Sequence, residues 1–318
     1  MITPAADGGD ETPDVSKLVA PELAENLRNL SVTLNRQTNA LFKGIDLMRE
    51  QWAEFYGKTT AIKISDGYLE GLRLREKQLA DSFRAAFRGL IPANWPEGAI
   101  SRIDEIAAIL EADGIPIVHI PRAEIVAQLM DASTLAERLN IVEMRADDIA
   151  NDCKAALSGQ LHRAIEEQAP LAFNSVESFL DGHYAAAQAL AVLVCDTYLK
   201  LYLGGEVLTS KGKARRVTYS EMAAAVTIEN SISNPIGLAL NIFYAFAPVA
   251  SFLTEWWPDK LDQGPSPTML SRHASVHNAS IEFMTKRNAT IAIMLVTSLT
   301  VAIDKMERWA DRRKLSTS

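Results

Sequence analysis

One short run of residues has the types and the spacing for acid–base chemistry on a charged substrate. On a helix, His273 and His277 lie one turn apart on a shared face, and the long side chain of Arg272 can swing toward it. An imidazole transfers protons near neutral pH, and a guanidinium fork binds and stabilises phosphoryl oxygens. These residues therefore predict chemistry at a phosphodiester. The run reads Arg272-His273-Ala274-Ser275-Val276-His277.

The same two histidines allow two other interpretations. Their i,i+4 spacing is that of a zinc-binding pair, which needs at least a third ligand such as Glu282. The sequence contains no His-Glu-x-x-His pattern, the usual sign of a catalytic zinc on a helix. In a purely structural interpretation, Arg272 pairs with an acidic partner and the histidines pack or cap a helix. We expect no metal and no other cofactor at this site.

At this run the sequence resembles the HEPN superfamily of ribonucleases and toxins. The family signature is Arg, then a polar residue, then three or more variable positions, then His, and His273 takes the polar position here. The family motif usually precedes a last apolar helix, which corresponds to residues 288–299. Many relatives place Gly directly after the motif His, whereas this chain has Asn278. The resemblance covers roughly residues 160–310.

This resemblance implies a metal-independent endoribonuclease, in which the 2′-hydroxyl attacks the adjacent phosphorus and leaves a cyclic phosphate end. It assigns acid–base catalysis to His277 and stabilisation of the phosphoryl oxygens to Arg272. His273 would orient the other two residues or contact phosphate. HEPN domains commonly dimerise with two motifs facing one cleft, which implies a homodimer with a composite site. The resemblance suggests a toxin or phage-defence effector; the alternative is a non-catalytic HEPN-fold module for interaction or dimerisation.

Basic side chains that would hold RNA occur in two further places. One is the loop between residues 211 and 216, and the other follows the motif. Lys and Arg position phosphates without reading base sequence, although such a loop can also be a simple solvated turn. The predicted RNA-binding residues are Lys211, Lys213, Arg215, Arg216, Lys286 and Arg287.

The elements that must position these residues are predicted to be helices. Apolar periodicity predicts a helix over Gly182 to Leu203, then one from Ser220, an apolar one from Pro235 to Leu253 bent near Pro248, and a last one from Thr285 to Trp309. The first of these helices has an almost unbroken apolar face on which alanines permit close contact with another helix. That face consists of Ala186, Leu190, Leu193, Val194, Thr197 and Leu201.

The first half of the chain is also predicted to be helical. Helices over residues 21–56 and 68–90 should pair as a hairpin, and helical pattern recurs from Thr134 to Leu157. Residues 114–121 have proline at both ends of an apolar run, which favours an isolated extended connector over a sheet strand. Pro170 is expected to interrupt or bend the next helix.

The predicted fold class is therefore all-α, with an N-terminal helical region and a C-terminal HEPN-like up-and-down bundle. We expect an acidic disordered tail over 1–16, a helical region of unknown role over 17–157, the bundle over 158–312 and a short tail over 313–318. The N-terminal region is a possible contact for a protein partner or antitoxin.

Composition and charge limit the class of protein. Of 318 residues 48% are hydrophobic, enough for a sizeable core, and two cysteines are too few for a disulfide framework. The net charge of −8 arises entirely in residues 1–160, so an RNA would meet the second half. Residues 1–16 lack the features of a secretory signal. Residues 236–253 are uncharged, but Asn241 and Pro248 favour a buried helix, so we expect a cytoplasmic protein without membrane contact.

Overall fold

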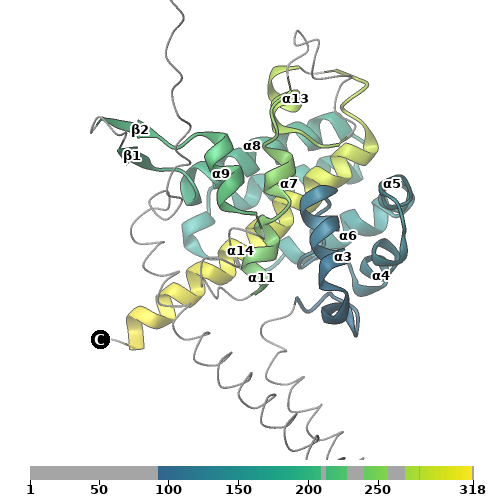
Figure 1. Ribbon diagram of the computed structural model, residues 1–318, viewed down its shortest axis with the longest axis horizontal. Helices are drawn as coiled ribbons and strands as arrows, with labels where there is room; N and C mark the ends of the chain where they lie inside the picture. Colours follow the sequence, from purple (N-terminus) through teal and green to yellow (C-terminus); the bar gives the residue numbers. More distant parts are fainter. Residues whose placement is uncertain (1–91, 209–212, 228–239, 257–268, 279, 317–318) are drawn as a thin grey trace, which may run out of the picture.

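The computed structural model describes residues 92–208, 213–227, 240–256, 269–278 and 280–316 of the chain. Within these ranges the fold is mostly helical, as the sequence predicts, and it also contains one small two-stranded sheet (Figure 1). The predicted tail over 1–16 and the predicted helices over 21–56 and 68–90 lie outside the described residues.

A long central helix, α14 (Lys286–Ser316), organises the fold. It runs diagonally through the middle of the molecule in Figure 1 and packs against α6 (Ala146–Leu157), α7 (Ala169–Leu180) and α8 (Tyr184–Tyr202). Every residue from Asn288 to Thr300 is buried, because neighbouring helices cover α14 on all sides there. The predicted last helix is confirmed, and it continues beyond Trp309.

By length and composition alone, α14 passes the test for a membrane-spanning helix between Lys286 and Arg312. It is the one helix of the described ranges that does so, and 78% of its apolar stretch is buried inside the fold. The core helix of a globular domain passes the same test, because its apolar surface is covered by protein. The uncharged stretch 236–253, which prompted the membrane question in the sequence, forms no such helix among its described residues.

That apolar stretch forms two short helices where the sequence predicts one bent helix. They are α11 (Leu240–Phe246) and α12 (Val249–Phe252), separated at Ala247 and Pro248. Proline lacks a backbone N–H and clashes with the preceding turn, so it ends α11 rather than bending it. Residues 235–239 of the predicted helix lie outside the described part.

Two further helix boundaries differ from the prediction. The pattern from Thr134 to Leu157 is two helices, α5 (Leu135–Met144) and α6, and Thr134 and Glu137 form a capping box at the start of α5. Pro170 does not interrupt a helix: it lies in the first turn of α7, where its missing N–H needs no intrahelical partner.

The predicted extended connector before α4 (Ala123–Asp131) is confirmed, since residues 114–121 form no strand. Its backbone is held by the side chain of Asn94, which donates to the carbonyls of Ile117 and Pro121 and accepts from the N–H of His119. The helical turns before it are η2 (Ala99–Arg102), α3 (Ile103–Ala107) and η3 (Ala108–Ala112), and η4 (Arg163–Ile165) follows α6.

Part of the predicted basic loop is a β-strand, which corrects the all-helical expectation locally. Strand β1 (Glu206–Leu208) pairs antiparallel with β2 (Ala214–Arg216), in the register Glu206 to Arg216. Short charged strands are tolerated at a sheet edge that faces water, so the basic residues that suggested a loop do not exclude pairing. Helix α9 (Tyr219–Ala225) then begins at a capping box of Thr218 and Glu221, one residue before the predicted start.

Helix α8 is confirmed, but its predicted apolar face is not the face that the fold buries. Leu193 and Leu201 are 56% and 57% exposed. Because α8 is apolar nearly all round, its periodicity could not select the buried side. The side against α14 and α7 carries Ala187, Ala191, Val192, Cys195, Tyr198 and Leu199, all of them buried.

One continuous hydrophobic cluster joins residues from Trp95 to Ile303. It includes Ile149 and Cys153 before the proposed boundary at residue 157, and Val176 and Ala191 after it. The division of the chain at that boundary and the HEPN-like arrangement of the second half stay predictions.

Candidate functional site

The whole candidate motif lies on one short helix, α13 (Arg272–His277). Ser271 begins it: the Ser271 hydroxyl accepts from the N–H of Ala274 and donates to the carbonyl of Thr254, just after α12, both at 3.3 Å. A six-residue helix does not persist through its own hydrogen bonds. Contacts with α8 and with the end of α12 therefore hold α13 in place.

The guanidinium of Arg272 is fixed by two side chains from other elements. Its Nε donates to Oδ1 of Asp196 on α8 at 2.6 Å, and its Nη2 donates to the hydroxyl of Tyr219 on α9 at 2.8 Å. The guanidinium carbon also lies 3.7 Å from the centre of the Tyr219 ring. Only 13% of the Arg272 side chain and 12% of the Asp196 side chain are exposed. Asp196 is therefore the acidic partner of Arg272 that the structural interpretation of the motif expects.

Asp196 is a point of convergence for three donors. Lys200, one turn further along α8, approaches its Oδ2 to 2.5 Å, and the hydroxyl of Tyr219 donates to its Oδ1 at 2.8 Å. Burial disfavours the charged carboxylate, but bonds from Lys200, Arg272 and Tyr219 outweigh it and lower the pKa of Asp196 below its usual value. One carboxylate thus faces two cations, and the cluster retains a net positive charge.

The remaining donor group of Arg272, Nη1, makes no hydrogen bond to any residue in the described ranges. It is also not among their fully buried unbonded atoms. A fork held at Nε and Nη2 has little orientational freedom left, so this third nitrogen is presented in a fixed direction. The geometry suits recognition of an anionic oxygen.

The two histidines form a contact pair, as the spacing predicts. Their ring centroids are 4.8 Å apart at an interplanar angle of 47°. His273 is buried, at 6% exposure, whereas His277 is exposed. Beside them Gln188 of α8 donates to the hydroxyl of Ser275 at 3.2 Å, which fixes the inner face of α13. The pair therefore joins a buried imidazole to a solvent-facing one.

Arg272 does not share the face of the histidine pair. It precedes His277 by five positions, which is roughly 140° around a helix of 3.6 residues per turn. Its side chain runs inward to Asp196 and Tyr219, while His277 faces solvent. Within one chain the structure therefore brings the two histidines together and directs the Arg272 guanidinium away from them, toward Asp196 and Tyr219.

The basic residues predicted on the loop lie mainly on β2. Lys213 and Arg216 are exposed, whereas Arg215 is bound to the carboxylate of Glu221 on α9. Lys211 lies outside the described residues. The hairpin leads through Val217 and Thr218 directly into Tyr219, so β2 connects to the residue that holds Arg272 (Figure 1).

The basic residues after the motif are placed separately, at the start of α14. The ammonium of Lys286 is 3.0 Å from the carboxylate of Asp147 and 5.7 Å from the Tyr184 ring centre. Arg287 is partly buried, and its Nε has no hydrogen-bond partner among the residues that the structure describes. Lys286 is therefore engaged by a carboxylate, and Arg287 is only partly accessible to a ligand.

Sequence reasoning missed Asp196, Lys200 and Tyr219. One signal was available: Asp196 is the sole Asp, Glu, Lys or Arg between Asp181 and Lys200, in the middle of an apolar helix. An acidic residue in such surroundings needs a cationic or donor partner. The identity of that partner depends on tertiary packing.

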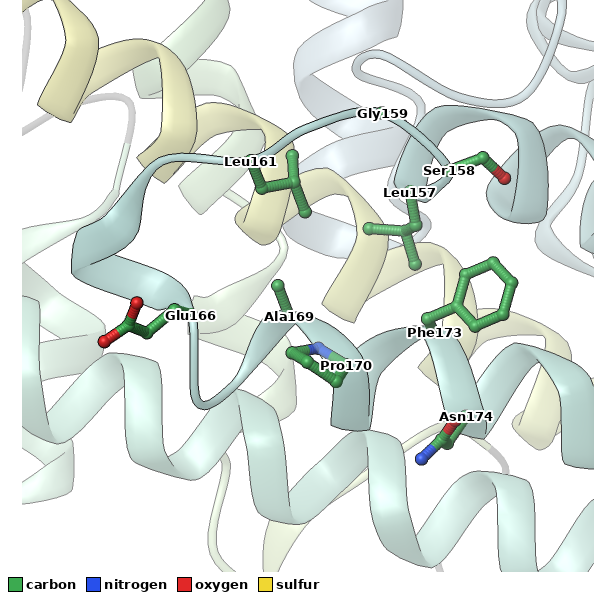
Figure 2. A pocket seen from close by; sticks show the side chains of 9 residues that line it. All are labelled: Leu157, Ser158, Gly159, Leu161, Glu166, Ala169, Pro170, Phe173 and Asn174. Carbon is green, nitrogen blue, oxygen red and sulfur yellow. The ribbon is translucent and has the colours of Figure 1, made fainter.

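A hollow of about 450 Å³ lies elsewhere, between the end of α6 and the start of α7. In Figure 2, Leu157, Leu161 and Phe173 point into it, and Glu166 stands at its rim. No residue of α8 or α13 lines it. The hollow is therefore separate from the motif.

Within the described ranges, no group of three or more His, Cys, Asp or Glu residues is placed to hold a metal ion. No protein-family model, curated protein or solved structure matches this chain. The resemblance to HEPN proteins is therefore supported only by the motif and by the sequence around it.

Proposed function

We propose that the chain is a metal-independent endoribonuclease of HEPN type, with its site on α13. The observation that carries the proposal is the pairing of a solvent-facing His277 with a buried His273 on the helix that also carries an anchored Arg272. A proton-transferring group and a fixed guanidinium are the two functions that phosphodiester cleavage without a metal requires.

The roles of the residues follow from their surroundings. His277 takes the proton of the attacking 2′-hydroxyl and returns a proton to the leaving 5′-oxygen, which gives a cyclic phosphate and a 5′-hydroxyl end. The Nη1 group of Arg272, which has no partner among the described residues, binds a phosphoryl oxygen whose charge grows during the attack. His273 is buried, which favours orienting the His277 ring over contacting phosphate.

Exposed Lys213, directly before β2, and exposed Arg216 on β2 are the best-placed predicted phosphate contacts outside the motif. Two such contacts add modest, salt-dependent affinity. Lys211 and Arg287 complete the proposed set, with Arg215 and Lys286 already engaged by carboxylates. RNA and a second copy of the chain are the proposed partners, because Arg272 and His277 diverge within one chain. A cytoplasmic toxin or phage-defence effector is the proposed cellular role.

A second candidate function has its own support, namely the Arg272–Asp196 ion pair. A guanidinium that is 13% exposed and bonded to both Asp196 and Tyr219 is what a helix-docking contact requires. In this alternative the chain is a non-catalytic interaction module, and α13 is simply pinned to α8 and α9.

The test is incubation of the full-length protein with RNA in the presence of a chelator. We expect cleavage products with cyclic phosphate ends from the wild-type protein and at least a 100-fold slower reaction with His277→Ala, since general acid–base catalysis supplies about 10²–10⁴-fold. His277 is exposed, so its removal should leave the fold intact.

His183→Ala is the matched control, because His183 is an exposed histidine at the start of α8. Its variant should cleave at the wild-type rate. Equal RNA integrity with wild-type protein and His277→Ala would favour the interaction module, and cleavage only after metal is added would contradict the proposed mechanism.

A further inference from the structure

Lys200 near the end of α8 supplies a cation that the described part of the protein does not neutralise. Its ammonium lies 2.5 Å from Oδ2 of Asp196, and that carboxylate already accepts from Arg272 through Oδ1. Among the ion pairs of the described ranges, Asp196 is the one carboxylate that two Lys or Arg side chains share. Arg102 and Arg145 show the opposite arrangement, since each contacts two carboxylates. The cluster at Asp196 therefore has one positive charge in excess.

The excess charge is most accessible at Lys200. The side chain of Lys200 is 57% exposed, compared with 13% for Arg272. A lysine ammonium has three N–H donors, and Asp196 and Tyr219 occupy at most two of them. The bond to Asp196 also raises the pKa of Lys200, so the ammonium stays charged at neutral and alkaline pH. Lys200 can therefore bind an anionic oxygen while it remains bonded to Asp196.

A purely structural role does not account for this second cation. The carboxylate of Asp196 is already bonded to the guanidinium of Arg272 and to the hydroxyl of Tyr219, so it does not need Lys200 as a partner. An Asp–Lys pair one turn apart on a helix contributes little to stability when the lysine is exposed. The position of Lys200 beside Arg272 is therefore better explained by a ligand that carries negative charge.

The two cations face in different directions. The Nε and Nη2 groups of Arg272 donate toward Asp196 and Tyr219, and Lys200 lies on this bonded side. Because the guanidinium is planar and its donors form a rigid fork, Nη1 points away from that side. One strand can therefore present one phosphate to Nη1 and the next phosphate to Lys200. We propose that Lys200 is a second phosphate-binding residue of the candidate site, which holds the phosphate beside the one bound by Arg272.

This inference deepens the proposed function and rests on it for the identity of the ligand, which is RNA. The excess charge at Asp196 follows from the ion pairs alone. Lys200 would contact a phosphate that does not react, so its contribution is the same before and during the chemical step. Such a contact lowers KM without changing kcat, which distinguishes it from a residue that acts by positioning Arg272.

The first test measures binding of the full-length protein to a fluorescent single-stranded RNA whose 2′-hydroxyls are all methylated, so that it cannot be cleaved. Each phosphate contact with a single strand contributes about 0.7 to the slope of log affinity against log salt concentration. We expect Lys200→Gln to reduce this slope by about 0.7 and to weaken binding about fivefold at about 0.1 M salt. Lys200→Arg should restore both values, because it restores the charge.

Lys154→Gln is the matched control. The ammonium of Lys154 also lies 2.5 Å from a carboxylate, that of Glu177, its side chain is 43% exposed, and neither residue bonds to Asp196 or Arg272. Both substitutions remove one positive charge, so a difference between them reports the position of the charge. Equal effects of the two variants, or an unchanged slope with Lys200→Gln, would overturn the proposal. A wild-type protein that does not bind the methylated RNA would overturn it as well.

Cleavage of unmodified RNA lets the two proposals fail separately. We expect Lys200→Gln to raise KM about fivefold and to leave kcat within about twofold of the wild-type value. A large fall in kcat with an unchanged KM would overturn the proposal, because Lys200 would then act by positioning Arg272. Binding of the methylated RNA through Lys200 without any cleavage of unmodified RNA removes the proposed function and keeps this inference. Cleavage by the wild-type protein, with equal binding by Lys200→Gln, does the reverse.

Discussion

Asp196 is the residue on which the position of Arg272 depends. It neutralises a nearly buried guanidinium and accepts from Tyr219 and Lys200 at the same time. Removing one member of a buried pair leaves the other charge uncompensated, which is more costly than losing an exposed pair. Asp196 is therefore a positioning residue in the proposed site and a structural residue in any case.

We expect Asp196→Asn to lower the free energy of unfolding by about 2–4 kcal/mol, because Arg272 and Lys200 would face each other without a carboxylate. Asp147→Asn is the control: it also removes a carboxylate from an ion pair, with Lys286, but 75% of the Asp147 side chain is exposed. Its effect should stay below about 1 kcal/mol. Urea denaturation of both variants checks this, and equal losses would contradict the role of Asp196.

His119 should make stability depend on pH. Its backbone has φ of +70°, its Nδ1 lies 3.2 Å from the ammonium of Lys305, and its Nε2 is buried without a described partner. Burial, and then the charge of Lys305, lower the pKa of His119 to about 3. In the unfolded chain the pKa is near 6.5, so below that pH the unfolded state binds a proton that the folded state refuses.

The contribution of His119 to the free energy of unfolding is therefore fully present above pH 6.5 and is lost as the pH falls toward 3. The slope of this free energy against pH should reach about 1.4 kcal/mol per pH unit. His119→Asn should flatten it, because Asn does not titrate and tolerates a positive φ. Denaturation between pH 7.5 and pH 4.5 measures both slopes, and parallel curves for the two proteins would refute the assignment.

At the scale of elements, α9 links the basic hairpin to the candidate motif. Its first residue, Tyr219, holds Arg272, and its capping box ties Thr218 to Glu221, which in turn binds Arg215 of β2. The start of α9 therefore determines where Tyr219 points. The orientation of the Tyr219 side chain therefore depends on this local hydrogen bonding as much as on packing.

Loss of a capping hydroxyl should reveal that dependence. We expect Thr218→Ala to lower the free energy of unfolding by about 1 kcal/mol and to slow any RNA cleavage as well. Thr134→Ala removes the equivalent hydroxyl from the capping box of α5 and should lower stability equally without affecting cleavage. Thermal denaturation and the cleavage assay separate the two effects, and equal loss of cleavage in both would indicate a general effect of stability.

At the scale of the whole molecule, α14 is the common core of the described helices. Leu299 is completely buried on it, whereas Leu315 near its end is 80% exposed. Leu299→Ala should lower the free energy of unfolding by about 2–5 kcal/mol through lost burial and a residual cavity. Leu315→Ala, the same change on the same helix, should stay within about 0.5 kcal/mol. Urea denaturation compares them, and a small effect at Leu299 would contradict the central position of α14.

Periodicity predicted the existence of α8 and α14, and the prolines around residues 114–121 predicted the connector, because these signals are local. Periodicity did not predict the helix ends at Arg145 and Pro248, where Arg145 alone, and Ala247 with Pro248, separate two helices. It also did not predict β2, where charged residues pair in a two-stranded sheet. It also failed to choose the buried face of α8, since an apolar helix has no polar side to mark the solvent.

The sequence by itself determined that this chain is largely helical and that His273 and His277 share one face, because both follow from the repeat of a helix. Only the tertiary structure decided that Arg272 turns away to Asp196 and Tyr219, and that Leu193 and Leu201 stay exposed. Those outcomes depend on which helices become neighbours, and packing between residues far apart in the chain is not encoded in any local spacing.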